Sequence, residues 1–524
     1  MERNEILKKI ILKINKKQFA SQQELSLALK KTAGSFKIAS PQKIELISAY
    51  HKLRQQGRIR ANPSLEKWLT KREIRTLSGV AVIAVLTKPY PCPGQCLFCP
   101  TEKAMPKSYL SNEPAVMRAI GCGFNPYKQV KARLTALKMT GHDTDKCELI
   151  VMGGTWSYLP HKYQTWFIKR CFEAFNGKTA KNLDQAQKLN ESAKFRVIGL
   201  TLETRPDYIN AAEIKRMREL GCTRVEIGVQ SLDDKVLKFN QRGHSTQQTI
   251  VATKLLKDAG FKISYHMMPN LPTSTPAKDL AIFKKLFTDS NYQPDQMKIY
   301  PCVVTKGSQL YKSYQKKKYR PYTDKQLINL LLKVKKIIPP YVRISRLIRD
   351  IPGESIVAGC KVSNLRQLLQ RTSTQLICQC IRCREARNKP LTVNKLQLTK
   401  RKYNASEGIE YFLSYESKDK KTLFAFLRLR LPQKPDAQLL KNFPALKDSA
   451  IIREIHTYGQ LVPLKSKKQA VQHAGLGKKL IELAEKTAKQ NGFKKIAVIS
   501  GIGVRKYYQK LGYKLQDTYM LKNL

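Results

Sequence analysis

The feature that most restricts this chain is an unbroken apolar run at residues 80–86, followed within a Gly/Pro-containing loop by Cys92, Cys96 and Cys99. An apolar run of this length, rich in valine, fits a parallel strand that is buried on both faces. Three thiolates at this spacing can hold three irons of a cubane cluster and leave the fourth iron open. One zinc ion is the alternative, but zinc prefers four ligands, and the next cysteine, Cys122, lies far beyond the loop. The pattern therefore predicts an α/β fold with an iron–sulfur site at the carboxyl end of a strand.

The spacing Cys-x-x-x-Cys-x-x-Cys resembles the signature of the radical SAM superfamily. An open iron can chelate the amino and carboxylate groups of S-adenosylmethionine (SAM). One electron from the cluster can then cleave SAM to a 5′-deoxyadenosyl radical. We therefore expect a [4Fe-4S] cluster and SAM as cofactors.

A rhythm of strand, loop and helix starts at residue 80 and predicts parallel βα units. Six units make a partial (β/α)6 barrel, which we place at residues 76–340. The expected strands are 80–86, 148–152, 196–200, 224–229, 263–266 and 297–300, and the clearest expected helices are 127–139, 208–220 and 246–259.

Polar motifs recur where these strands end, and the carboxyl end of a parallel sheet is where ligands bind. Each motif alone could be turn chemistry or an ion pair. Together they predict a site in which glycine-rich backbone binds the methionyl end of SAM. The cofactor-binding candidates in this part are Gly153, Gly154, Thr155, Glu203, Arg205 and Gln230, and a further motif covers residues 266–272. Lys298 lies in the sixth strand, where it is either exposed at the surface or an ammonium that lines the barrel.

A second cysteine cluster, Cys378, Cys380 and Cys383, lies in the segment 341–395, where the strand and helix rhythm has stopped. Three thiols within six residues converge readily on one metal, and a Cys₄ zinc site needs one more ligand. Our first choice is Cys302, directly after the sixth strand, with Cys360 as the second choice. Chance placement of the cysteines is the alternative.

The charge of the chain is extreme, with 97 Lys/Arg against 39 Asp/Glu and a formal net charge of +58. Such an excess indicates a polyanionic partner, and nucleic acid is the first candidate. A lysine-rich composition inherited from an AT-rich genome would account for part of it. Residues 1–75 have helical spacing and carry 18 Lys/Arg against six Asp/Glu. We expect a basic helical segment there that contacts RNA phosphates, the alternative being an ordinary solvated helical surface.

No apolar run approaches 18 residues, and the N-terminus lacks the apolar core of a signal peptide. We therefore expect neither a membrane span nor export. We therefore expect the 12 cysteines to be metal ligands in a reducing cytoplasm and not to form disulfides.

Residues 396–524 change character, with β-rich runs at 408–416, 422–431 and 451–457 and a helical segment that runs to residue 490. Between them, residues 472–477 match the Gln/Arg-x-x-Gly-x-Gly/Ala signature of GNAT acetyltransferases. In that signature, amides at a helix N-terminus bind the coenzyme A pyrophosphate. A strand at 495–500 and the ending at 503–513, with Tyr507 and Tyr508, also resemble the GNAT pattern. We expect a GNAT α/β domain here.

A radical SAM barrel followed by a GNAT domain resembles the catalytic subunit of Elongator and its stand-alone bacterial and archaeal relatives. The resemblance covers nearly the whole chain, except that Thr273 stands where many relatives have glycine. Its motifs are Arg-Thr-Leu-Ser-Gly at 75–79, Glu-Pro at 113–114, Met-Arg-Ala-Ile at 117–120, Val-Met-Gly-Gly-Thr at 151–155, Glu-Thr-Arg-Pro-Asp-Tyr at 203–208, Glu-Ile-Gly-Val-Gln-Ser at 226–231, Arg-Asp-Ile-Pro at 349–352, Arg-Glu-Ile-His at 453–456 and Tyr-Tyr at 507–508.

The resemblance implies a tRNA wobble-uridine carboxymethyltransferase, which uses a SAM-derived radical and acetyl-CoA to build a 5-carboxymethyl group in the anticodon. Our own hypothesis for catalysis is that Tyr507 or Tyr508 orients the thioester or relays a proton and that Lys298 stabilises charge beside it. The acetyl-CoA candidates are Lys146, Glu454, Ile455, His456, Thr457, Gln472, His473, Gly475, Leu476, Gly477, Lys478 and Tyr507. For the two domains to share one reaction, we expect the coenzyme at Gly475 and Gly477 to face the carboxyl end of the barrel.

Two other functions remain open from the sequence. A protein lysine acetyltransferase would need only the GNAT domain, and an idle tRNA-binding protein would explain the charge but not the cysteine spacing. The oligomeric state, a homodimer included, and the electron donor are not determined by the sequence.

Overall fold

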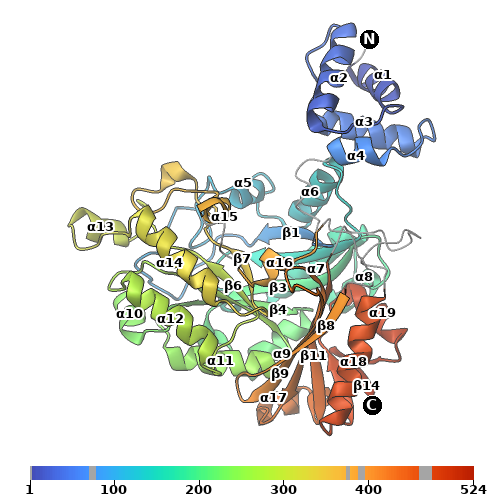
Figure 1. Ribbon diagram of the computed structural model, residues 1–524. Coiled ribbons are helices and arrows are strands. Elements are labelled where there is room, and N and C mark those ends of the chain that lie inside the picture. Colours follow the sequence, from blue (N-terminus) through green and yellow to red (C-terminus); the bar gives the residue numbers. More distant parts are fainter. Residues whose placement is uncertain (1–2, 70–77, 373–377, 388–395, 459–474) are drawn as a thin grey trace.

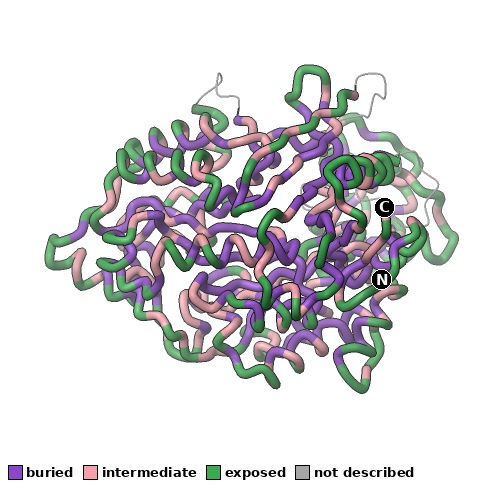
Figure 2. Tube along the Cα trace, turned by 90° about the horizontal axis from the view of Figure 1, so that it is seen from below, coloured by how far each residue is buried: buried purple, intermediate pink, exposed green. Residues whose placement is uncertain are grey.

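The computed structural model describes residues 3–69, 78–372, 378–387, 396–458 and 475–524. These residues form a small helical module, a parallel half-barrel and a second, mixed sheet (Figure 1). Buried residues concentrate along the strands, and exposed residues lie on the outer helices and turns (Figure 2). No helix within the described ranges combines the length and apolarity that crossing a bilayer requires.

The half-barrel is a sheet of seven strands in sequential order, and every neighbouring pair is parallel. This confirms the α/β barrel, with one strand more than predicted. Its strands are β1 (Ala81–Leu86), β2 (Lys146–Met152), β3 (Arg196–Thr204), β4 (Arg224–Gln230), β5 (Lys262–Met267), β6 (Gln296–Ile299) and β7 (Arg343–Arg346).

The seventh strand, β7, lies in the segment that we expected to be a linker, so the barrel continues beyond residue 340. The strand has four residues, and only Ile344 among them is buried. Such a short, mostly polar strand gives no periodic signal. It is held by pairing with β6, where Met297 lies opposite Ile344.

Helices cover the outside of the half-barrel (Figure 1). The helix that spans Thr246–Asp258 begins with a capping box at Ser245 and Gln248, the arrangement that satisfies two free amides at a helix start. The helices of this part are α5 (Pro114–Ile120), α6 (Pro126–Met139), α7 (His161–Asn176), α8 (Leu183–Asn190), α9 (Ala211–Glu219), α10 (Asp234–Phe239), α11 (Thr246–Asp258), α12 (Pro276–Thr288), α13 (Leu310–Gln315), α14 (Asp324–Ile337), α15 (Leu365–Thr372) and α16 (Ile381–Arg384).

The second sheet has the order β13-β14-β12-β11-β10-β9-β8, in which only the β11–β12 pair is parallel. Strands β8, β13 and β14 were not predicted, because β8 alternates between half-buried and exposed residues and the other two are short. The elements are β8 (Leu396–Asn404), β9 (Gly408–Ser417), β10 (Leu423–Pro432), α17 (Ala437–Asn442), β11 (Ser449–Thr457), α18 (Leu476–Gln490), β12 (Lys495–Val498), α19 (Arg505–Gln509), β13 (Lys514–Gln516) and β14 (Tyr519–Asn523).

The helical module at the N-terminus has its own hydrophobic core and projects from the body of the molecule (Figure 1). Ile6, Ile10 and Ile14 recur along one face of the first helix and are buried in that core, as their spacing predicted. The helices are α1 (Arg3–Ile14), α2 (Gln22–Ser35), α3 (Lys43–Gln55) and α4 (Pro63–Leu69). The expected helical segment is therefore confirmed.

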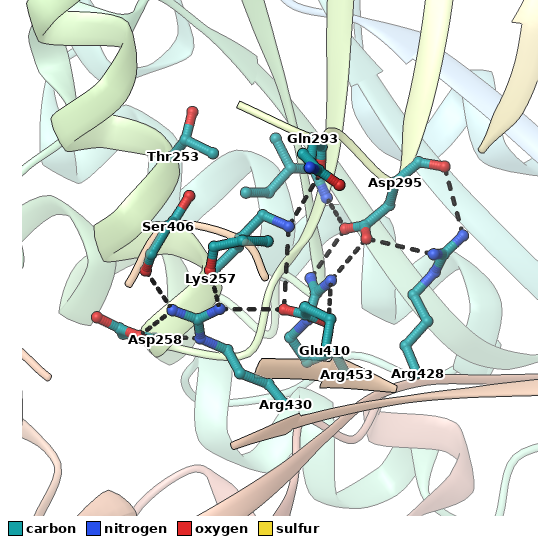
Figure 3. A network of polar contacts seen from close by, with 12 residues as sticks. Thr253, Lys257, Asp258, Gln293, Asp295, Ser406, Glu410, Arg428, Arg430 and Arg453 are labelled. Atoms are coloured by element: carbon teal, nitrogen blue, oxygen red, sulfur yellow. Dashed lines mark hydrogen bonds and ion pairs between the residues drawn. The ribbon is translucent and has the colours of Figure 1, made fainter. Parts of the chain in front are cut away.

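A buried network of charges joins the second sheet to the half-barrel (Figure 3). Asp295, just before β6, binds Arg453 of β11 at 2.6 Å and Arg428 of β10 at 3.5 Å. Arg430 of β10 binds Asp258 of α11 at 2.6 Å and Glu410 of β9 at 3.2 Å. These side chains are almost completely shielded from solvent, so each charge depends on its partner across the interface.

Candidate active site

The cysteine loop after β1 opens into a cavity of about 890 Å³, and Cys92, Cys96 and Cys99 all line it. Backbone hydrogen bonds fix the loop: the Leu97 amide donates to the carbonyl of Asn240 at 3.2 Å, and the Leu310 amide donates to the carbonyl of Leu97 at 2.8 Å. The loop is therefore held from two sides at the carboxyl end of the barrel.

The three sulfurs of this loop do not converge on one point, because they do not all lie within 4.8 Å of one another. Thiolates on a single zinc ion lie about 4 Å apart, given a Zn–S bond of about 2.3 Å. Sulfurs that bind three different irons are spread around a cluster. The donor set thus fits a cubane cluster better than a single ion.

Gly153, Gly154 and Thr155 follow β2 beside this loop, as predicted. Both glycines have positive φ, +135° and +101°, and a Cβ at Gly153 would lie only 2.0 Å from Oγ1 of Thr87. Oγ1 of Thr155 lies 3.7 Å from Sγ of Cys92. The turn therefore requires glycine and presents its backbone next to the cysteine loop.

The parallel register brings the polar residues of four strands together. Glu203 lies opposite Glu226, and His266 lies opposite Lys298. Nε2 of His266 is 2.9 Å from Oε2 of Glu226, and Glu203 accepts a hydrogen bond from Tyr109 at 2.9 Å. All four strand residues line the cavity.

Lys298 lines the barrel and is buried, so surface exposure is the wrong alternative. Its ammonium forms an ion pair with Glu226 and lies 3.6 Å from Glu203. Burial disfavours its charge, but Glu226 outweighs that penalty and raises the pKa of Lys298. This ammonium and Arg224, whose guanidinium lies 3.7 Å from Glu226, offset the negative charge of the two carboxylates.

Arg205 and Gln230 also line the cavity. Nη2 of Arg205 binds Asp207 at 2.8 Å and the carbonyl of Gly243 at 3.1 Å. Gln230 has a φ of 68° at the end of β4, a conformation that non-glycine residues rarely adopt and that often marks functional sites.

A second group of predicted residues meets at the start of α18. Gly475 has a φ of +71°. A Cβ at Gly477 would lie 3.5 Å from the hydroxyl of Tyr507, 3.7 Å from Cδ1 of Ile455 and 3.9 Å from Oγ1 of Thr457. The structure therefore brings these residues together from β11, α18 and α19.

Other acetyl-CoA candidates are placed differently. Leu476 is buried, and Lys478 faces solvent, where it lies 3.7 Å from Glu482. Tyr508 is in the hydrophobic core, where burial raises its pKa, so only Tyr507 remains near Gly477. Gln472 and His473 lie outside the described residues.

Strand β11 divides its predicted ligands between two sites, because successive side chains of a strand point to opposite faces. Ile455 and Thr457 face Gly477. Glu454 and His456 face the barrel, where Glu454 binds Arg428 at 2.9 Å and Nε2 of His456 lies 2.7 Å from the carbonyl of Ser78. That residues 454–457 bind acetyl-CoA stays a prediction, and of their side chains those of Ile455 and Thr457 lie at Gly477.

We had expected the acetyl-CoA site to face the carboxyl end of the barrel. The second sheet packs instead against the amino ends of the barrel strands. Lys262 and Arg343 are the first residues of β5 and β7. Nζ of Lys262 lies 3.7 Å from Glu454, and Arg343 donates to the hydroxyl of Tyr458 at 2.8 Å. Lys146, the first residue of β2, lies at this same end, half-buried, and burial lowers its pKa.

The cavity connects the two ends through the interior of the barrel. Its lining includes Cys96 at the carboxyl end, Ala84 and Ile150 inside the barrel, and Glu454 and His456 on the second sheet. The two halves of the molecule thus share one internal space.

The second cysteine cluster is compact: the sulfurs of Cys378, Cys380 and Cys383 all lie within 4.8 Å of one another. It sits near the amino end of β7, because the amide of Ile381 binds the carbonyl of Val342 at 3.0 Å. The neighbouring thiols lower the pKa of Cys380 by hydrogen bonding to its sulfur. This geometry suits a single ion.

Cys302 does not belong to this cluster. It follows β6 at the carboxyl end, inside a hydrophobic group with Val304 and Leu310, whereas the cluster lies at the amino end. The second choice, Cys360, is also at the carboxyl end, since nearby Ala358 bridges to Val304. The sulfurs of Cys302 and Cys360 are absent from the compact group among the described residues, so the structure supports neither choice of fourth ligand.

Several cavity residues were not selected from the sequence. Arg349 binds Glu113 at 2.9 Å, and both residues belong to motifs that were noticed only through the family resemblance. Arg242 lies 3.4 Å from the sulfur of Cys96, and no motif had marked it.

Comparison with known proteins agrees with this geometry. The profile described as the radical SAM superfamily matches residues 90–286, and that of the radical SAM C-terminal domain matches residues 294–375. A tRNA uridine(34) acetyltransferase from Methanocaldococcus jannaschii is 45% identical over 473 residues, which cover 87% of this chain and 86% of the relative.

Elongator complex protein 3 from Homo sapiens is 36% identical over 524 residues, which cover 96% of this chain and 93% of that protein. The solved structure of Elp3 from Methanocaldococcus infernus, with residues 1–46 deleted, matches with a TM-score of 0.75 and 42% identity, covering 85% of this chain and 99% of that one. The chain therefore belongs to the radical SAM superfamily and, within it, to the family of the tRNA uridine(34) acetyltransferases and Elongator complex protein 3.

Proposed function

We propose that this enzyme builds a 5-carboxymethyl group on the wobble uridine of tRNA, with SAM and acetyl-CoA as co-substrates. The observation that carries the proposal is the single cavity whose lining extends from Cys96 through the barrel to Ile455, the residue that also lies beside Gly477. Relatives that are tRNA uridine(34) acetyltransferases point to uridine 34 of tRNA as the substrate. A radical is suited to this reaction because an uncharged uracil carbon offers no easy polar route.

Membership in the radical SAM superfamily implies a [4Fe-4S] cluster and SAM. When bound, they supply a carbon radical that can remove hydrogen from an unactivated C–H bond. Cys92, Cys96 and Cys99 would hold the cluster, and the backbone of Gly154 and Thr155 would bind the methionyl end of SAM.

Inside the barrel, Lys298 presents a fixed positive charge beside Glu226. An ammonium placed before the reaction in a site shielded from water stabilises negative charge that develops on a substrate oxygen. Lys298 is therefore our candidate catalytic residue on this side of the cavity.

The corner formed by Gly475, Gly477, Ile455, Thr457 and Tyr507 would hold acetyl-CoA in a GNAT-type domain. The free amides at the start of the 15-residue helix α18 suit the pyrophosphate. Tyr507 is 42% exposed, so its hydroxyl is available to orient the thioester. Lys146 would approach the coenzyme from the barrel side.

The tRNA would bind through the strongly basic surface, with the helical module of residues 3–69 as one contact. Phosphate contacts need little more than positioned lysine and arginine. The anticodon loop is single-stranded, so turning the uridine outward costs only a few kcal/mol.

Cys378, Cys380 and Cys383 would bind zinc in a structural role. Ile381 and Arg384 bind the backbone of Val342 and Pro340 in the barrel, and the backbone of Ala386 binds that of Leu423 in the second sheet. An ion here would therefore stabilise the junction of the two parts.

The test is anaerobic reconstitution with iron and sulfide, followed by nucleoside mass spectrometry of tRNA incubated with SAM, acetyl-CoA and a reductant. We expect 5-carboxymethyluridine, and with methyl-deuterated acetyl-CoA we expect deuterium in the released 5′-deoxyadenosine. Unlabelled 5′-deoxyadenosine alongside modified tRNA would contradict hydrogen removal from the acetyl group. Acetylated lysine formed without consumption of SAM would instead identify a protein acetyltransferase.

A further inference from the structure

Two buried arginines flank the cysteine loop, and their electrostatic situations differ. Arg205 is neutralised by Asp207, with Nη2 to Oδ2 at 2.8 Å. Arg242 has no carboxylate within ion-pair distance among the described residues, although it is only 7% exposed. A buried cation without an anion is costly, so its surroundings should supply negative charge.

The guanidinium of Arg242 is held in one orientation. Nε and Nη2 both donate to the carbonyl of Gly228 in β4, at 3.2 Å and 2.6 Å. Nη1 then points at the sulfur of Cys96, 3.4 Å away. Gly228 makes this approach possible, because a Cβ there would lie 2.5 Å from Nη2.

The segment that carries Arg242 is fixed to the same loop by its backbone. The carbonyl of Asn240 accepts from Leu97, and the carbonyl of Gly243 accepts from Arg205 at 3.1 Å. The contact between Arg242 and Cys96 therefore rests on several independent hydrogen bonds.

We propose that Arg242 is a positioning residue that sets the reduction potential of the iron–sulfur cluster through a charge-assisted N–H···S bond to the Cys96 thiolate. Reduction adds one electron, taken from an external one-electron reductant, and no bond forms or breaks. The added negative charge is stabilised by a fixed cation and by a donor to a ligand sulfur, so both raise the potential. Arg242 thus makes the cluster easier to reduce.

The test is a redox titration with dithionite of the reconstituted full-length protein, followed by the EPR signal of the reduced cluster. It needs neither tRNA nor acetyl-CoA, so its outcome is independent of the proposed function. Arg242→Gln should shift the midpoint potential to a more negative value. Gly228→Ala keeps the charge but displaces the guanidinium, so a smaller shift in the same direction is expected.

Arg218→Gln is the matched control. Arg218 is also buried and also bonds to neutral oxygens, those of Thr518 and Cys222, but it lies at the junction with the second sheet. Its loss should lower stability and leave the midpoint potential unchanged.

An Arg242→Gln protein with full iron content and the wild-type potential would overturn the proposal. If the Arg242→Gln protein does not retain iron, the Gly228→Ala protein provides the test. A Gly228→Ala protein with full iron content and the wild-type midpoint potential would then contradict the proposal.

Discussion

Each end of the half-barrel carries one group of three cysteines from a single short segment, and the two groups differ in how far apart their sulfurs lie. At the carboxyl end, Cys92, Cys96 and Cys99 surround an open space. At the amino end, the sulfurs of Cys378, Cys380 and Cys383 lie within 4.8 Å of one another, beneath the second sheet. The difference shows that the number of thiols does not define a metal site, because their separation decides whether they surround a cluster or hold one ion.

The largest effect should come from the carboxyl end. If Cys92, Cys96 and Cys99 hold the cluster as proposed, replacing all three by alanine removes its protein ligands, so cluster iron and SAM cleavage should fall to background. Iron analysis and chromatography of 5′-deoxyadenosine measure this. Zinc content should not change, and Cys122→Ala should behave as wild type. A triple variant that kept its iron would show that these three cysteines do not hold the cluster and would contradict the difference proposed between the two cysteine groups.

At the amino end, Cys380→Ser should release zinc and destabilise the fold by more than about 4 kcal/mol, as loss of a structural metal does. Elemental analysis and urea unfolding are the measurements. Iron content should be retained after reconstitution. Cys302→Ser should keep its zinc, and loss of zinc in that variant would restore Cys302 as a ligand.

Asp295→Asn tests the charge network at the same end. It leaves Arg453 and Arg428 with one anion fewer, and breaking a buried pair costs about 3–5 kcal/mol. The charged partners Arg453 and Arg428 outweigh the burial penalty and hold the pKa of Asp295 below its usual value. Its contribution is therefore complete above the unfolded pKa of about 4 and is lost as pH falls toward the folded pKa.

Thermal unfolding between about pH 6 and pH 3 should consequently show a shallower loss of stability in Asp295→Asn than in the wild type. Equal slopes in the two proteins would mean that this carboxylate does not stabilise the interface.

The smallest effect should come from the helical module, which belongs to neither end. Lys16→Gln with Lys17→Gln removes two exposed charges, so tRNA affinity should fall a few-fold, and the slope of log K against log salt should decrease by about one to two. Lys486→Gln with Lys489→Gln, exposed on α18, is the matched control. Equal losses in both pairs would indicate a diffuse charge effect and not a contact.

Much of the barrel could be predicted from the sequence because its strands are long apolar runs. The same regularity predicted that Gly153 and Glu203 share one site, since parallel strands in register bring their polar residues together, whereas surface exposure of Lys298 remained an alternative. β7 could not be predicted, because among its four residues only Ile344 is buried, whereas the equally short β6 is buried throughout.

The orientation of the second sheet could not be predicted from local sequence patterns. It depends on pairs such as Asp295 with Arg453, which are 158 positions apart. The structure does not bring Cys302 to the group of Cys378, Cys380 and Cys383, and sequence spacing does not reveal at which end of the barrel a residue lies. Arg242 lies in no motif, and only its 3.4 Å contact with Cys96 distinguishes it.

The charge network also has a consequence for how the protein is made. Asp295 leaves the ribosome about 160 residues before Arg453, its main partner. At roughly 5–20 residues per second, the half-barrel waits about 10–30 s with this carboxylate unmatched. During that interval its amino end exposes the surface that the second sheet later covers. The second sheet covers this surface only after its strands have been synthesised.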